Sequence, residues 1–544
     1  MHKPFVVMVR LLPSLALIIL TSLSGTVRAQ QADTTRPGPV TVYMPFVTVG
    51  DSGTVRSAAV DPLVLASGPS VFAACTIGGT STSTNYPNAE VEPWVDINPT
   101  DATNLIAVWQ QDRWSDGGAH GLATAVTHDG GATWQMVTPP AFSQCASGTA
   151  ANGGDYERAS DPWVTFAPNG HAYQISLSFN ATSNVSAILV SKSADGGNNW
   201  SLPTTLIRDS GERDSTYAFN DKEAITADPT NANYVYAVWD RFVTPGGTSF
   251  ASLSGYIHSR AFRQPIWFAR TTDGGQTWEP ARKIYDRSSF NGTLGSQIVV
   301  LPNGDLVNIF DEFFIVKNAQ GRRGINIALI RSTDKGTNWS RKSILVGEDL
   351  SLGAVNPDTG VRIRAEGGIP DVAVNRTNGT LYAVWQDARF SGVDGVAFAS
   401  SSDGGFTWST PMKVNRTPVN SGNPLNQQAF VPSVHVADNG VIGLTYYDFR
   451  NNTTAAGALT DYWIIQCNPA LSNCNDAANW QEQQLSTVSF DIEQAPAARG
   501  PFGFFVGDYE GLTSTGNSFR PLFVQVNNGN MGNRTDVFTT SVTP

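Results

Sequence analysis

The octapeptide Thr127-His-Asp129-Gly-Gly131-Ala-Thr-Trp134 decides the fold of this chain, because its pattern, Ser/Thr-x-Asp-x-Gly-x-x-Trp, returns four more times. The other copies are residues 193–200, 271–278, 332–339 and 401–408. An eight-residue pattern with four restricted positions that recurs in this way indicates a repeated supersecondary unit. We therefore expect the chain to consist of copies of one such unit.

Each copy of the pattern predicts the turn of a β-hairpin. The short Asp side chain accepts backbone N–H groups a few residues on and so holds a tight turn. The Gly two positions later allows a backbone conformation that a side chain would forbid, and the Trp begins the next strand with a large apolar surface. A residue set shared by every repeat is scaffolding more often than chemistry, so we interpret these octapeptides as structural.

The pattern resembles the Asp-box, or bacterial neuraminidase repeat, of the sialidase superfamily of β-propellers, and the resemblance covers most of the chain after about residue 90. It implies an all-β fold, a β-propeller of four-stranded antiparallel blades, with the boxes on the face away from the active centre. Asp-box propellers also include other polysaccharide-degrading enzymes and non-catalytic proteins. The motif therefore implies the fold more strongly than the activity.

The segments before the boxes predict the number of blades. Each has a polar or acidic lead, a short strand, an Asn-Pro or Asn-Gly turn and then an apolar strand, and a seventh such unit, without a box, spans residues 507–526. We expect seven blades. Six, the number in sialidases of the resembled family, is the alternative. A strand from residues 70–75 is expected to complete the last blade and cover its open edge.

Composition agrees with one large all-β domain, which we place at residues 86–544. The 544 residues include 51 Gly and 31 Pro, and only 15% are charged. The net charge of −11 and the absence of a basic run argue against nucleic acid and against anionic membrane surfaces as partners. We expect a monomer.

The amino terminus is typical of a secretory signal. Positive charges at Lys3 and Arg10 precede the apolar residues 11–20, and a small-residue cleavage site ends at Ala29. The apolar run is short for a membrane span. We expect residues 1–29 to be removed, residues 30–85 to form a spacer that includes the closing strand, and the protein to be secreted, extracellular or periplasmic.

The four cysteines are even in number and favour disulfides in an exported protein. Cys467 and Cys474 flank the place where a sixth Asp-box is expected, so a covalent clip can replace the hydrogen-bonded turn. Cys75 would then pair with Cys145, although four cysteines allow three connectivities. No Cys/His cluster has zinc spacing, and we expect no cofactor, with structural calcium bound by acidic leads as the alternative.

A second recurrence lies where the second strands end, at the end of each unit opposite to the boxes. Aromatic residues are followed there by an acid and an Arg, as in Trp109-Gln-Gln-Asp112-Arg113 and Trp385-Gln-Asp387-Ala-Arg389. One interpretation is that each Asp pairs with the neighbouring Arg inside its own blade. The other is a pocket in which converging guanidinium groups bind a carboxylate.

The resemblance gives these residues roles, because sialidases hold the sugar carboxylate with three arginines, use a tyrosine activated by a glutamate as nucleophile and use an aspartate as acid/base. The corresponding candidates for substrate binding are Arg113, Arg241 and Arg389, with Glu92 and Asp221 beside them. The candidates for catalysis are Tyr509 with Glu510, or Tyr447, as nucleophile, Asp112 as acid/base, and Glu366 or Glu223 as substitute base. Adjacent strand residues point to opposite faces, so Tyr509 and Glu510 share a pocket only where the strand is irregular.

The chain departs from the family in one respect: the early Arg-Ile-Pro signature has no copy before the first box. The hypothesis is therefore a sialidase-like glycoside hydrolase that cleaves terminal sugars, including sialic acid, from glycans. The alternatives are another polysaccharide hydrolase or lyase, and a non-catalytic propeller that binds glycans or proteins.

Overall fold

The computed structural model describes residues 59–209, 216–245, 263–288, 291–314, 323–365, 369–498 and 503–544. Within these ranges the regular structure is β-strand, apart from short 3₁₀ helices. These helices are η1 (Gln144–Ala146), η3 (Pro424–Gln427), η4 (Ala477–Asn479) and η5 (Ile492–Gln494). The expected all-β class is confirmed. The predicted signal sequence lies outside the described residues.

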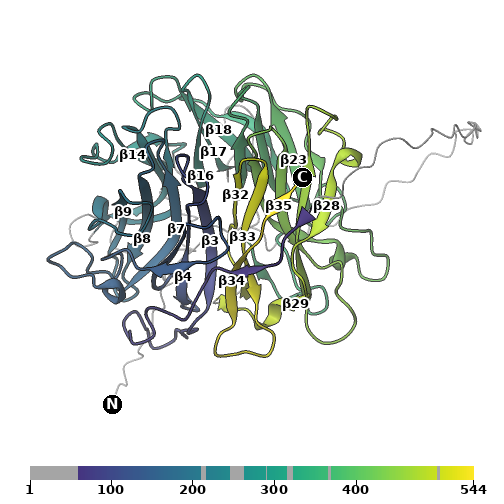
Figure 1. The fold of residues 1–544 in the computed structure, drawn as a ribbon, viewed down its shortest axis with the longest axis horizontal. Coiled ribbons are helices and arrows are strands. Elements are labelled where there is room, and N and C mark those ends of the chain that lie inside the picture. The colour runs from purple at the N-terminus through teal and green to yellow at the C-terminus, as the bar shows by residue number, and fades with distance from the viewer. Residues whose placement is uncertain are drawn as a thin grey trace, which may run out of the picture.

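Most strands fall into four-stranded antiparallel units in which each strand pairs with the next (Figure 1). Unit 1 is β3 (Glu90–Ile97), β4 (Leu105–Arg113), β5 (Ala119–Thr127) and β6 (Gln135–Val137). Unit 2 is β7 (Arg158–Phe166), β8 (Ala172–Phe179), β9 (Ser186–Ser193) and β10 (Thr204–Asp209). Unit 3 is β11 (Thr216–Ala227), β12 (Val235–Pro245), β14 (Ile266–Thr271) and β15 (Arg282–Tyr285).

The later units follow the same order. Unit 4 is β16 (Asn291–Val300), β17 (Leu306–Phe314), β18 (Gly324–Ser332) and β19 (Ile344–Asp349). Unit 5 is β21 (Asp371–Val374), β22 (Leu381–Asp387), β23 (Gly395–Ser401) and β24 (Met412–Lys413). Unit 6 is β25 (Ala429–Val436), β26 (Ile442–Asp448), β27 (Leu459–Cys467) and β28 (Gln481–Gln484). The short strands outside the units are β13 (Arg263–Gln264), β20 (Ile363–Arg364), β29 (Phe490–Asp491), β30 (Ala497–Ala498) and β31 (Gly503–Phe505).

The last unit joins the two ends of the described chain. Its strands β32 (Gly511–Thr515), β33 (Ser518–Val526) and β34 (Thr535–Thr539) are completed by the N-terminal strand β2 (Val64–Leu65), which pairs with β34. Beside them, β1 (Ala59–Val60) pairs with β35 (Val542–Thr543), where the purple and yellow ends of the chain meet in Figure 1. Residues 70–75, which we expected to provide the closing strand, lie instead outside any strand.

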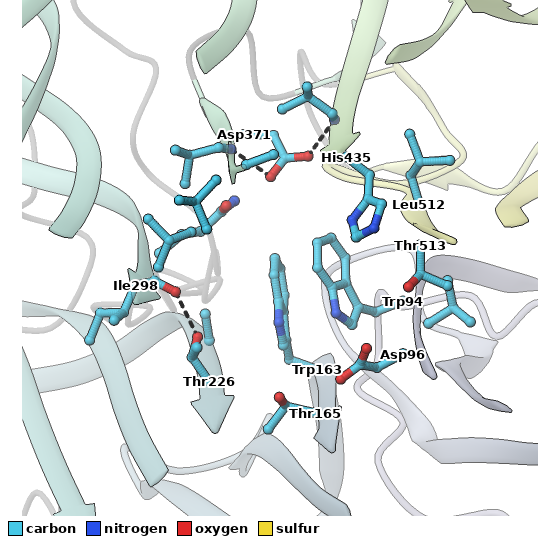
Figure 2. A pocket seen from close by; sticks show the side chains of 18 of the residues that line it. Trp94, Asp96, Trp163, Thr165, Thr226, Ile298, Asp371, His435, Leu512 and Thr513 are labelled. Carbon is cyan, nitrogen blue, oxygen red and sulfur yellow. Dashed lines mark hydrogen bonds between the residues drawn. The ribbon is translucent and has the colours of Figure 1, made fainter. Parts of the chain in front are cut away.

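The first strands of the seven units pack against one another in sequence, from β3 through β7, β11, β16, β21 and β25 to β32, and β32 contacts β3. Side chains bridge several of these neighbours. Asp96 accepts a hydrogen bond from the backbone of Phe166 at 2.7 Å, and Thr226 donates one to the carbonyl of Ile298 at 2.8 Å. Residues from all seven first strands line one cavity of about 160 Å³. Figure 2 shows this cavity, with the Thr226–Ile298 bond on one wall.

The Asp-boxes form the turns between third and fourth strands, as predicted. In the first box, Thr127 Oγ1 donates to Asp129 Oδ1 at 2.7 Å and accepts from the backbone of Gly131 at 3.0 Å. Asp129 Oδ1 also accepts from the backbone of Thr133 at 2.9 Å. The other four boxes repeat this set of bonds. The Gly at the fifth position of the box adopts a positive φ in every copy, which explains why no side chain stands there.

Two disulfides, Cys75–Cys145 and Cys467–Cys474, confirm the expected pairing. The second lies in the connection from β27 to β28, where units 1 to 5 carry an Asp-box. Trp480, just beyond it, is buried and donates to the carbonyl of Cys474 at 3.0 Å. The covalent clip therefore stands in place of the hydrogen-bonded turn. No helix among the described residues is long and apolar enough to cross a membrane.

Candidate functional site

A β-bulge interrupts the first strand in each of units 1, 2 and 3, and residues of these bulges form the candidate site. The pairing of the first and second strands shifts at residues 92–93 in β3, 161–162 in β7 and 222–223 in β11. The first residue of each bulge has a positive φ, namely 55° at Glu92, 50° at Asp161 and 51° at Lys222. Bulges redirect side chains out of the regular alternation, and non-glycine residues held at positive φ occur at functional sites more often than elsewhere.

These three bulge residues meet in one buried cluster. Lys222 Nζ lies 3.3 Å from Glu92 Oε1 and 3.7 Å from Asp161 Oδ1. The cluster is completed by Asp508, whose Oδ2 lies 2.5 Å from Lys222 Nζ and 2.9 Å from an Arg364 terminal nitrogen. The five side chains come from units 1, 2 and 3, from β20 and from the segment before β32. We call them the charge cluster.

Backbone contacts place Asp508 beside Glu92. The backbone N–H of Glu92 donates to the carbonyl of Val506 at 3.2 Å. A Cβ atom added at Gly507 would lie 3.0 Å from Glu92 N and 2.8 Å from the carbonyl oxygen of Tyr509. Only glycine therefore allows this close approach of the last unit to the first.

The charge cluster separates the pKa values of its carboxyl groups. Burial raises the pKa of Glu92 well above its usual range, and the nearby charges of Asp161 and Asp508 add to the effect of burial against the opposing Lys222 ammonium. Burial also acts to raise the pKa of Asp161, but Lys222 and a hydrogen bond from Glu92 outweigh it, so that pKa is lowered. The pKa of Asp508 is lowered too, because Arg364 and Lys222 outweigh burial. Glu92 is therefore the protonated member among ionised partners.

The cations of the site stay charged. Burial opposes the charge of Lys222, yet Asp161, Asp508 and Glu92 raise its pKa well above the usual value. Burial, with the neighbouring Arg364, lowers the pKa of Arg113 to about 10, which leaves it protonated at neutral pH. The guanidinium groups of Arg113 and Arg364 each lie 4.6 Å from the centre of the Phe505 ring. Of the three arginines predicted to bind substrate, Arg113 thus belongs beside the charge cluster.

The other two predicted arginines bind carboxylates elsewhere. Arg389 forms two hydrogen bonds with Asp387 of its own unit, at 2.8 and 2.7 Å. Arg241 pairs with Asp209 of the neighbouring unit and stacks over Trp267. For Arg389, the interpretation in which each Asp pairs with its neighbouring Arg describes the observed contacts.

Tyr509 lies under the charge cluster. Its hydroxyl donates to the carbonyl of Pro162 at 3.1 Å, and its ring centre is 5.3 Å from that of Trp163. Burial and the charges of Glu92, Asp161, Glu223 and Asp508 raise its pKa well above 10. The hydroxyl is therefore held protonated, which is the reverse of an activated nucleophile.

Glu510 contacts Tyr447 instead of Tyr509. Tyr447 Oη donates to Glu510 Oε1 at 2.9 Å, and both side chains are fully buried in the core cluster that contains Phe430 and Tyr462. Burial raises the pKa of both groups well above their usual values. Tyr509 and Glu510 lie in the segment between β31 and β32, outside any strand, and their side chains have different surroundings.

Of the remaining predicted site residues, Asp112 makes its contacts outside the charge cluster and Asp221 lies at its edge. Asp112 accepts from Ser70 Oγ at 2.6 Å, from the backbone of Asn88 at 2.8 Å and contacts His120 at 3.2 Å. Burial acts to raise the pKa of Asp112, but these contacts lower it, so this residue is not a proton donor at neutral pH. Asp221 is half-buried beside Lys222 and accepts from its backbone at 3.1 Å. Glu366 lies outside the described residues.

Glu223, a substitute base in the sequence analysis, is fully enclosed. Neither carboxyl oxygen has a hydrogen-bond partner within the part of the chain that the structure describes. Burial, followed by the charge of Asp161, raises its pKa well above the usual value. Glu223 is therefore a second protonated carboxyl next to the charge cluster.

Asp161, Lys222, Arg364 and Asp508 were not predicted from the sequence as members of this site, and acidic leads were expected there only as alternative calcium ligands. One signal was present. Glu92-Pro-Trp94 and Asp161-Pro-Trp163 repeat an acid before Pro and Trp, and the structure shows that both acids occupy a bulge. Across the described ranges, no group of three or more His, Cys, Asp or Glu side chains is arranged to hold a metal ion.

The stacked rings of Trp94 and Trp163 lie in the cavity between the first strands, as Figure 2 shows, with their centres 3.4 Å apart. His435 of β25 and Asp371 of β21 line the same cavity. His435 Nε2 is 3.1 Å from Ser514 Oγ, and burial lowers its pKa to about 3. This neutral histidine joins strands β25 and β32.

No protein-family model matches the chain, and neither does any curated protein. Among solved structures, it is similar to a Hadza microbial sialidase, with 16% identity, a TM-score of 0.42 and coverage of 81% of this chain and 74% of that chain. It is similar to an α-L-arabinanase of Penicillium chrysogenum complexed with arabinobiose, with 12% identity, a TM-score of 0.41 and coverage of 89% and 98%. It is also similar to a protein of unknown function from Dyadobacter fermentans, with 15% identity, a TM-score of 0.41 and coverage of 71% and 94%. At these values the similarity assigns neither a family nor an activity.

Proposed function

We propose that this protein is a seven-bladed β-propeller that hydrolyses glycosidic bonds at the charge cluster. The seven units are its blades, their first strands surround the axis, and β2 completes the last blade. The observation that carries the activity is the meeting of Glu92, Asp161 and Lys222, each from a bulge at the same level of a different blade, with Asp508.

Glycoside hydrolysis uses two carboxyl groups of different protonation state, one to protonate the leaving oxygen and one to activate water or attack the sugar. Glu92, with its raised pKa, is the proposed acid, and Asp161, which accepts its hydrogen bond and has a lowered pKa, is the proposed base or nucleophile once a bound sugar separates the two carboxyl groups to the spacing that the reaction needs. Lys222 holds both in place. Tyr509 lies next to the charge cluster and takes no part in the proton transfer.

The charge of the site favours an acidic sugar. With Glu92 protonated, the cations Lys222, Arg113 and Arg364 outnumber the ionised carboxylates of Asp161 and Asp508 by one. A guanidinium group binds a sugar carboxylate in the geometry for which arginine is suited. A sialoside is therefore the first substrate of this class to assay, and a secreted protein would meet such glycans.

Incubation with fluorogenic glycosides, with a sialoside, a glucuronide and an arabinofuranoside side by side, tests this proposal. We expect turnover of at least one substrate, and a loss of about 10²- to 10⁴-fold in kcat for Asp161→Asn, as for removal of a general base. Asp155→Asn is the control, because its exposed carboxylate pairs with Arg208 away from the charge cluster. Turnover that survives Asp161→Asn unchanged would contradict the proposal.

One observation favours a second candidate, a propeller that binds glycans without cleaving them. Every member of the charge cluster is less than a tenth exposed, and Lys222 already pairs with three carboxylates. Such a network can serve to fasten blades 1, 2, 3 and 7 together. Glycan binding without turnover of any substrate would support this candidate over the hydrolase.

A further inference from the structure

A cleft of about 530 Å³ lies between the fifth and sixth units, on the side of the Asp-boxes. Its walls come from β22 and β23, from the fifth box and from the disulfide loop that follows β27. The charge cluster lies near the start of the first strands, whereas the boxes follow the third strands. Because neighbouring strands are antiparallel, the cleft and the charge cluster lie at opposite ends of the units.

The junctions that follow units 2, 3 and 4 show what this cleft lacks, whereas unit 1 has Val126 before its box. In units 2, 3 and 4 the residue just before the box is a long cation, and it reaches the box of the next unit. Lys192 Nζ donates to the carbonyl of Gly274 at 2.6 Å, and Arg270 and Arg331 donate to the carbonyls of Lys335 and Gly404. All three carbonyls belong to the same position of the box. These cations fill the space between consecutive units.

Unit 5 breaks this rule on both sides of the junction. The residue before its box is Ser400, whose short side chain donates to Asn475 Oδ1 at 3.1 Å. The next unit has no box, because the Cys467–Cys474 loop replaces it. The cleft is the space that the missing cation and the missing box leave. The cleft is therefore a defined feature of the fold at this junction, and a disulfide fixes one of its walls.

The chemistry of the walls is that of a site for a neutral saccharide. None of the lining residues is an acid, a lysine, an arginine or a histidine. A charged ligand would find no counter-charge there. Hydroxyl and amide groups line the cleft, and the side-chain Nδ2 atoms of Asn378 and Asn475 form no hydrogen bond with another described residue. Trp408 is half-buried at the cleft and offers an aromatic surface for the C–H face of a sugar ring.

We propose that this cleft binds a neutral oligosaccharide, separately from the charge cluster. Its volume is within the range of small-molecule sites, and it combines an aromatic surface with a few convergent polar groups. The inference does not depend on the hydrolase. A secreted glycan-binding protein would use such a cleft to stay on a polysaccharide while the opposite face is free.

Isothermal titration with cellotriose, xylotriose and mannotriose, on the full chain, tests this inference. We expect saturable binding of at least one of them. Trp408→Ala should weaken that binding by about tenfold or more, as expected for the loss of one aromatic contact surface. Trp200→Ala is the matched control, because Trp200 holds the same box position and makes the same hydrogen bond to its own box, Nε1 to Gly197 O at 2.8 Å against Gly405 O at 3.2 Å for Trp408.

Ser400→Arg provides a second variant that restores the cation found at positions 192, 270 and 331. We expect it to fill the cleft and abolish binding while its thermal unfolding midpoint stays at or above that of the wild type. Absence of binding by the wild type to all three probes would overturn the inference, and so would undiminished binding by Ser400→Arg. Turnover at the charge cluster is measured separately, so failure of the hydrolase proposal leaves this test intact.

Discussion

Lys222 and Asp508 are separated by 286 positions in the chain, yet Lys222 Nζ lies 2.5 Å from Asp508 Oδ2. The pair joins the third unit to the segment that leads into the last. It also balances the two further carboxyl groups, Glu92 and Asp161, that approach the same ammonium. The start of the first strands is therefore held by one buried ionic network.

Lys222→Met should lower the free energy of unfolding by about 3–5 kcal/mol, because it leaves buried carboxylates without their cation. Lys283→Met is the control. Lys283 pairs with Asp286 at 2.6 Å, but its side chain is 46% exposed, so its loss should change stability by about 0.5 kcal/mol or less. Urea titrations of the two variants measure the difference, and equal effects would show that the charge cluster is not a stabilising network.

The raised pKa of Asp371 predicts that its contribution to the free energy of unfolding falls between about pH 4 and pH 6. Burial raises its pKa to about 6, although Ser433 and the backbone of Val434 and Val372 donate to it. The folded state thus keeps a proton that the unfolded state releases near pH 4, so the stability that Asp371 contributes is fully present below that pH and is lost as the pH rises through 6. The change amounts to about 3 kcal/mol.

Asp371→Asn removes this titration. Unfolding free energies of the wild type and the variant, measured at intervals from pH 3.5 to pH 7, should show a destabilisation by the substitution that shrinks as the pH rises. A difference that is constant over the whole interval would contradict a raised pKa at this carboxyl.

The Ser or Thr at the first position of each box should contribute as much to stability as the Asp at the third position. Ser193 is buried, donates to Asp195 at 2.8 Å and accepts from the backbone of Gly197 at 2.9 Å. Ser193→Ala leaves that N–H without a partner and should cost about 1–3 kcal/mol. Ser402→Ala, at an exposed position inside a box, should be neutral within the error of a denaturant titration.

The two disulfides should contribute different amounts to the free energy of unfolding. Cys75–Cys145 links residues 70 positions apart and Cys467–Cys474 links residues 7 apart. If a disulfide acts by restricting the unfolded chain, replacing the first pair with serine costs about 4 kcal/mol and the second about 2–3 kcal/mol. Thermal unfolding of the two double variants checks this order, and a larger loss for the short loop would point to a role in holding the cleft wall and Trp480.

The local parts of the fold could be predicted from the sequence. Each box carries its own turn chemistry, so residues such as Asp129 and Gly131 predict a hairpin wherever they occur together. The disulfide at Cys467 could be predicted for the same reason, because the clip occupies the place of a missing box. Both inferences need contacts only a few residues apart.

The candidate site could be predicted only in part, because it depends on contacts between distant segments. The recurrence of acid and Arg after the second strands was visible, but Arg389 pairs with Asp387 two residues away, as a repeated local motif would. Lys222 has no such recurrence, and its role follows from a bulge that changes the direction of its side chain. Tyr509 and Glu510 precede β32, where strand alternation does not apply, and only the structure shows that Tyr447 is the partner of Glu510.

The most direct test of the account compares two buried glutamates of one strand, by measuring kcat against pH for Glu92→Gln and Glu90→Gln on the best glycoside of the panel. Both carboxyl groups have raised pKa values, but Glu90 binds Gln111 at 2.8 Å, whereas Glu92 meets Lys222 in the charge cluster. We predict that Glu92→Gln lowers kcat by about 10²- to 10⁴-fold and abolishes the alkaline limb of the pH profile, as expected for loss of a general acid. Glu90→Gln should keep the wild-type kcat and the alkaline limb. Wild-type kcat and an unchanged alkaline limb in Glu92→Gln would contradict the assignment of this cluster as the catalytic site.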